Sequence, residues 1–126
     1  MKKRIGDAFM PADEYGRSLH NGIGVNLLVR EVAPMAEFLR DVLAAELIYA
    51  DLDFATLIVF GSSMMLHADH TYLDHPLHGV ICGVENRGIG VEIRVYGCDP
   101  DMAESAARQR GDVILSGSMD KPHGLR

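Results

Sequence analysis

Gly22-Ile23-Gly24-Val25 returns later in the chain as Gly88-Ile89-Gly90-Val91, and the residues that follow the two tetrapeptides agree as well. The agreement extends to Val29 with Val95, Pro34 with Pro100 and, one residue out of step, Met35-Ala36-Glu37 with Met102-Ala103-Glu104. An internal repeat of this kind indicates the architecture of a chain before its individual helices and strands are assigned. We therefore expect a domain built by tandem duplication.

Each copy starts with a segment that alternates in polarity, which is typical of a strand with one buried face. The apolar members are Val25, Leu27 and Val29 in the first copy and Val91, Ile93 and Val95 in the second. The alternate members are Asn26, Leu28 and Arg30, and then Glu92, Arg94 and Tyr96. Because side chains alternate between the two faces of a strand, we expect each apolar trio to face a helix and each mixed trio to face the opposite surface.

An amphipathic helix is predicted after each of these strands. The first helix starts at Pro34, and its apolar stripe consists of Met35, Phe38, Leu39, Val42 and Leu43. In the second copy, Asp99 is a good N-cap, Pro100 suits the first helical turn and Gly111 ends the helix. The second helix has a thinner stripe, made of Met102, Ala103, Ala106 and Ala107.

Short strands complete the first copy. They are predicted at 46–50, 54–60 and 63–67, whereas the second copy reaches only a candidate strand at 113–116 before the chain ends. The expected fold class is therefore α+β, with tandem βαβββ modules that form a curved mixed sheet around a cleft, the second module being incomplete. The predicted divisions are an N-terminal arm at 1–21, module one at 22–70, a linker at 71–87 and a partial module two at 88–126.

Composition limits the function classes. The chain has 126 residues, of which 48% are hydrophobic and 24% charged, the values of one ordinary globular domain. A net charge of -6 argues against nucleic acid or an anionic membrane surface as a partner. No apolar stretch is long enough to span a membrane, and the two cysteines, Cys82 and Cys98, suit free thiols in a reducing compartment. We expect a soluble cytoplasmic protein.

The βαβββ repeat, with Phe38-Leu39-Arg40-Asp41-Val42-Leu43 followed by Glu46-Leu47-Ile48-Tyr49, resembles the vicinal oxygen chelate superfamily. This superfamily contains glyoxalase I, extradiol dioxygenases, and the fosfomycin- and bleomycin-resistance proteins. The resemblance implies a ligand cleft and a homodimer. It is specific for the fold and much less so for the activity, because one fold hosts many functions.

Enzymes of the superfamily hold a divalent metal ion with His or Glu side chains on the cleft face. Carried onto this chain, three of those positions fall on Gly24, Gly90 and Met65, and the turn that precedes a fourth is missing. Glycine has no side chain to coordinate an ion, and a thioether sulfur is a poor ligand for the ions in question. The resemblance therefore implies no metal and no cofactor here, as in the metal-free branch that includes the bleomycin-resistance proteins.

Four histidines offer a second possibility. They are His67, His70, His75 and His78, with Cys82 close behind. Imidazole suits zinc and iron, so a metal site on the segment from His67 to His78 would make the protein a metal-dependent lyase or dioxygenase. The alternative is that His67 faces the cleft from a strand while the others lie solvated in a loop that Pro76 interrupts.

The side chains expected to face the cleft are Asn26, Leu28, Arg30, Met65, His67, Glu92, Arg94 and Tyr96. Apolar surface with a few oriented polar groups is typical of a small-molecule pocket. Glu92 and Arg94 form either an ordinary ion pair or an anchor for a polar ligand, and His67 beside Glu92 would be an acid–base pair.

The favoured function is that of a glyoxalase/bleomycin-resistance-like protein, which binds a small molecule in the cleft without the usual metal. The metal-dependent enzyme on the histidine segment is the alternative, and whether the protein is catalytic stays open. A third possibility is a cleft that has lost its function in a protein devoted to interaction. Because the second copy stops before its last strands, we expect either a shortened chain or a second subunit over the exposed sheet edge.

Overall fold

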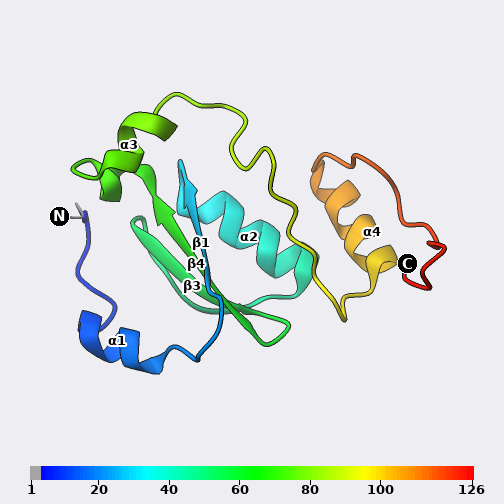
Figure 1. Ribbon diagram of the computed structural model, residues 1–126, viewed down its shortest axis with the longest axis horizontal. Coiled ribbons are helices and arrows are strands. Elements are labelled where there is room, and N and C mark those ends of the chain that lie inside the picture. Colours follow the sequence, from blue (N-terminus) through cyan, green and yellow to red (C-terminus); the bar gives the residue numbers. More distant parts are fainter. Residues whose placement is uncertain (1–3) are drawn as a thin grey trace.

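The computed structural model describes residues 4–126, which form an α+β fold around one four-stranded mixed sheet (Figure 1). The strands are β1 (Val25–Val29), β2 (Glu46–Ala50), β3 (Phe54–Val59) and β4 (Ser62–Ala68). The helices are α1 (Ala12–Ser18), α2 (Val32–Leu43), α3 (Pro76–Ile81) and α4 (Pro100–Arg110), with a 3₁₀ helix, η1, at Asp69–Tyr72. The sheet has the order β1-β4-β3-β2 and does not close into a barrel. The predicted fold class is confirmed at this level.

The first copy of the repeat forms the βαβββ unit that its pattern predicts. β1 pairs with β4 in parallel, whereas β3 pairs with β4 and with β2 in antiparallel fashion. α2 begins at Val32, before the predicted Pro34, and ends at Leu43, where Ala44 forms the C-cap with a left-handed φ of 53°. Phe60 and Gly61, with φ values of 45° and 82°, make the tight turn between β3 and β4.

The hydrophobic core lies between α2 and one face of the sheet. As predicted, Val25, Leu27 and Val29 point toward this core. Leu57 of β3 and Leu66 of β4 lie at its centre, and both side chains are fully buried. Alternate residues of each strand therefore face α2, and the remaining ones are left on the opposite face of the sheet.

The second copy differs from its prediction. Within residues 4–126, the segments 91–96 and 113–116 form no strand, so both strand predictions are wrong. Val91 is 71% exposed, although Val95 packs against the core. A strand exists only when a neighbour satisfies its backbone groups, and Gly88 and Gly90, with φ values of 80° and 90°, lie outside the strand conformation.

The predicted helix of the second copy is confirmed as α4. Asp99 caps it by accepting hydrogen bonds from the backbone N–H groups of Asp101 and Met102, and Gly111 ends it with a φ of 81°. α4 packs against α2 and lies at the opposite end of the molecule from α1 and α3 (Figure 1). Ala107 is its buried residue.

The arm and the linker both contain helices. α1 lies in the arm, η1 follows β4 directly, and α3 lies in the linker. The arm packs on the sheet: Phe9 stacks on Tyr49 with ring centroids 4.5 Å apart, and the Tyr15 hydroxyl donates to Thr56 Oγ1 at 2.9 Å. Its first three residues lie outside the described range.

A buried carboxylate fixes the arm. Asp53, which is fully buried in the turn between β2 and β3, accepts hydrogen bonds from the backbone N–H groups of Ile5 and Gly6, each at 2.8 Å. His70 Nε2 lies 2.6 Å from the same carboxylate, and the Arg4 guanidinium is 3.5 Å away. One side chain thus connects the arm, the hairpin turn and η1.

The pKa of Asp53 is the sum of opposing effects. Burial by itself raises this pKa, but the hydrogen bonds from His70, Gly6 and Ile5 and the charge of Arg4 outweigh burial and lower it below its ordinary value. A carboxyl group with a lower pKa in the folded state stabilises the fold above its unfolded pKa of about 4. That stabilisation is lost as the pH falls from about 4 through the lower pKa that Asp53 has in the folded protein.

We therefore expect Asp53→Asn to lower the free energy of unfolding by about 1–3 kcal/mol at pH 7, because an amide cannot accept from all the donors that surround it. Urea unfolding between pH 7 and pH 2 measures the free energy of unfolding of the parent and the variant at each pH. Below about pH 4, the variant should lose less stability than the parent. Asp13→Asn, at a side chain that is 68% exposed, is the matched control. Equal acid sensitivity in the parent and Asp53→Asn would contradict this account.

Candidate functional site

Half of the predicted cleft residues do lie together on the sheet face opposite α2. The parallel register places Asn26 beside Met65 and Leu28 beside His67. Because their neighbours in sequence point into the core, these four side chains share the other face. The alternation of β1 and β4 was sufficient to predict this group.

A chain of hydrogen bonds orients the polar members of this face. Asn26 Oδ1 lies 2.7 Å from His67 Nδ1, and Asn26 Nδ2 donates to the Tyr72 hydroxyl at 3.0 Å. An amide oxygen only accepts, so His67 carries a proton on Nδ1 in this arrangement. His67 is 8% exposed while Asn26 is exposed, so a buried ring holds an accessible amide in place.

Aromatic rings continue this face on either side of His67. Its ring centroid lies 4.9 Å from that of Phe54 and 5.6 Å from that of Tyr72, and Tyr15 of α1 meets Phe54 edge to face at 5.5 Å. These rings were not among the predicted site residues. Phe54 could have been found, because it pairs with His67 across β3 and β4, whereas nothing in the sequence places Tyr15 or Tyr72 here.

The principal cleft runs along the outer edge of β1 and has a volume of about 950 Å³. β1 forms its floor, α2 lies on one side and the chain from Ile81 to Gly88 on the other, and Arg110 and Asp112 at the end of α4 also line it. Three of the predicted site residues line it, namely Asn26, Leu28 and Arg30. The cleft exists because, within residues 4–126, β1 has a strand partner on one side only.

Arg87 closes one side of this cleft. Its guanidinium makes a bidentate pair with Asp69 at 2.6 and 2.5 Å and also donates to the backbone carbonyl groups of Leu28 at 3.3 Å and Ile81 at 3.4 Å. The bond to Asp69 raises the pKa of Arg87 above its already high value, so this group stays charged. Arg87 was not among the predicted site residues, since nothing in the sequence pattern connects it to β1.

Arg30 is held more loosely than Arg87. Its guanidinium meets Glu85 at 2.8 Å, but the two side chains are 54% and 77% exposed. Such solvated pairs contribute only about 0–1 kcal/mol. Arg30 is therefore a cation on the cleft wall that can change its partner.

The other predicted site residues do not join this group. Glu92, Arg94 and Tyr96 belong to the segment that forms no strand, and all of them are exposed. Glu92 and Arg94 form an ion pair with each other at exposed side chains, which is the ordinary surface pair. The predicted acid–base pair between His67 and Glu92 required Glu92 to lie on a strand that faces the cleft. Glu92 lies on no strand, so this arrangement is missing.

The histidines point in different directions. His70 binds Asp53, His67 binds Asn26, and His75 Nδ1 accepts the backbone N–H of Leu77 at 3.1 Å. Within residues 4–126, no three His, Cys, Asp or Glu side chains are grouped so that they could hold a metal ion. In the same range, no helix is both long and apolar enough to cross a membrane.

Comparison with models of known protein families and with curated proteins gave no match for this chain. The cleft and the side chains around it are therefore the basis for assigning a function.

Proposed function

We propose that this protein binds a small organic molecule in the cleft along β1, without a metal ion. The observation that carries this proposal is that Asn26, Leu28 and Arg30, predicted from the strand pattern alone, line the same cleft of about 950 Å³. Small-molecule sites have volumes of roughly 300–1,000 Å³. The resemblance of the first βαβββ unit to metal-free bleomycin-resistance-like proteins supports the same conclusion.

The walls of the cleft indicate the chemistry of the ligand. Leu27, Val29 and Phe38 are among its apolar residues, and they suit a hydrocarbon body. Arg30 offers a planar, charged fork that matches a carboxylate, and Asn26 offers an oriented amide nearby. We propose a ligand with an apolar body and one carboxylate or carbonyl group.

The metal-dependent lyase or dioxygenase receives less support. Its donors would be the histidines between His67 and His78, but His67 and His70 are engaged by different partners, Asn26 and Asp53. Three or four convergent ligands are needed to hold zinc or iron. Stoichiometric metal in the purified protein, lost in His67→Ala and His70→Ala, would overturn the metal-free proposal.

A thermal-shift screen against small acids, thiol conjugates and antibiotics should find a ligand, because binding to the native state raises its stability. For a carboxylate ligand, we expect Arg30→Ala to weaken binding roughly ten- to hundredfold, the value of a hydrogen bond to a charged group. Calorimetry with the acid and with its neutral amide measures this difference.

The amide is the internal control, since its affinity should change little in Arg30→Ala. Arg17→Ala removes another guanidinium that is paired with an exposed carboxylate, Asp13, and should leave both affinities unchanged. Equal loss for the acid and the amide, or no loss at all, would contradict a role for Arg30 in binding.

We also propose that two copies associate, as the resemblance implies. Ile89 and Val91 are candidate contact residues, because they are 80% and 71% exposed and burying apolar surface drives association. Sedimentation velocity should then show a dimer that Ile89→Asp with Val91→Asp shifts to monomer, while Val113→Asp, at an equally exposed residue, does not. A folded parent that sediments as a monomer would contradict the proposal.

A further inference from the structure

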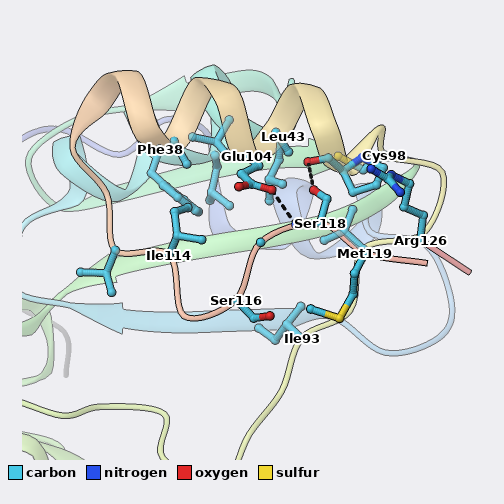
Figure 2. A pocket seen from close by; sticks show the side chains of 18 of the residues that line it. Phe38, Leu43, Ile93, Cys98, Glu104, Ile114, Ser116, Ser118, Met119 and Arg126 are labelled. Atoms are coloured by element: carbon cyan, nitrogen blue, oxygen red, sulfur yellow. Dashed lines mark hydrogen bonds between the residues drawn. The ribbon is translucent and has the colours of Figure 1, made fainter. Parts of the chain in front are cut away.

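A second cavity lies next to the cleft. It has a volume of about 660 Å³, is open to solvent on one side, and lies between α2, α4 and the segment after α4. Figure 2 shows this pocket with Phe38 and Leu43 from α2, Ile93, and Ile114 and Met119 from the segment after α4 around it. The cavity and the cleft share the side chains of Leu27, Met35 and Phe38. The two spaces are therefore neighbours that border the same side chains.

The second cavity is lined mainly by hydrocarbon. Its apolar members come from every element around it and include Val42, Leu43, Ile93, Ala103, Ile114 and Met119. Its most strongly held polar group is Glu104, which accepts the backbone N–H of Ser118 at 2.5 Å and binds Arg108 at 2.8 Å. These bonds lower the pKa of Glu104 to about 2, so it is an anion that is already satisfied within the protein. Lys121 and Arg126 also line the cavity, but most of its surface is apolar, so it suits an apolar group.

Side chains separate the two spaces. Met35 and Phe38 lie on α2 and are only partly buried, so neither is fixed by complete packing. Methionine is unbranched and has three rotatable bonds, which lets it adapt to a neighbour of a different shape. A narrow, flexible group of a ligand, such as an alkyl chain, can pass between these side chains without moving the protein backbone.

We infer that the ligand is an amphipathic carboxylate with an unbranched alkyl tail. Its head lies in the cleft at Arg30, and its tail passes Met35 and Phe38 into the cavity between α2 and α4. This inference rests on the proposed function, since it takes the same cleft as the site of the head group. It adds the class of ligand and a second subsite for the tail.

A series of linear carboxylates from butanoate to dodecanoate, each below its micelle concentration, tests this inference by calorimetry. Each buried methylene contributes about 0.8 kcal/mol, so affinity should rise about fourfold per added carbon. Ala103→Phe on α4 fills the second cavity without touching the cleft. In this variant we expect short acids to bind as in the parent, whereas the gain with chain length should stop early.

Ala106→Phe is the matched control, because Ala106 lies on the same helix but lines neither space. If Ala103→Phe does not unfold cooperatively in urea, Ile114→Trp fills the same cavity from the segment after α4. An equal dependence on chain length in the parent, the filled variant and Ala106→Phe would overturn the inference and leave the proposed function intact. Binding of other small molecules at the cleft, but of no linear carboxylate, would do the same. Failure of every compound to bind at the cleft would contradict the proposed function itself.

Discussion

The parallel pairing of β1 with β4 is the constraint on which this structure depends. Parallel neighbours require a crossover connection, and α2, β2 and β3 together supply it between β1 and β4. Packing α2 on the sheet fixes which face of β1 is buried, and therefore which face carries Asn26 and Leu28. It also leaves β1 at the edge of the sheet, so that the cleft runs beside a strand with one free side.

The cavity between the helices follows from the composition of α4. The side chains of α2 that line the cavity are large and include Met35, Phe38 and Leu43. Those of α4 include the small residues Ala103 and Ala107. Small side chains let the two helices pack together with Ala107 buried, but they do not fill the volume between the helices. The tail after α4 covers this space without filling it, since Val113 and Leu115 are 85% and 96% exposed.

The first copy of the repeat was predictable because its signals are local. Alternation predicted β1, the apolar stripe predicted α2, and turn residues predicted the limits of β2 to β4 within a residue or two. The interactions that the sequence did not reveal join residues far apart in the chain. Arg87, at one side of the cleft, donates hydrogen bonds to Asp69 and to the backbone carbonyl of Leu28. Asp53 fixes the arm by accepting hydrogen bonds from the backbone N–H groups of Ile5 and Gly6. No periodic pattern connects such partners.

The second copy shows why a repeat in sequence need not become a repeat in structure. A capped helix is satisfied within its own segment, so Asp99 and Gly111 were enough to predict α4. A strand depends on a neighbour, and the left-handed Gly88 and Gly90 turn the chain just before the alternating segment. The alternation of Val91 with Glu92 therefore produces an exposed segment rather than a second cleft wall. The polar groups around the cleft accordingly come mainly from β1, β4 and the linker, and the second copy contributes Gly88, Arg110 and Asp112 to the lining of the cleft.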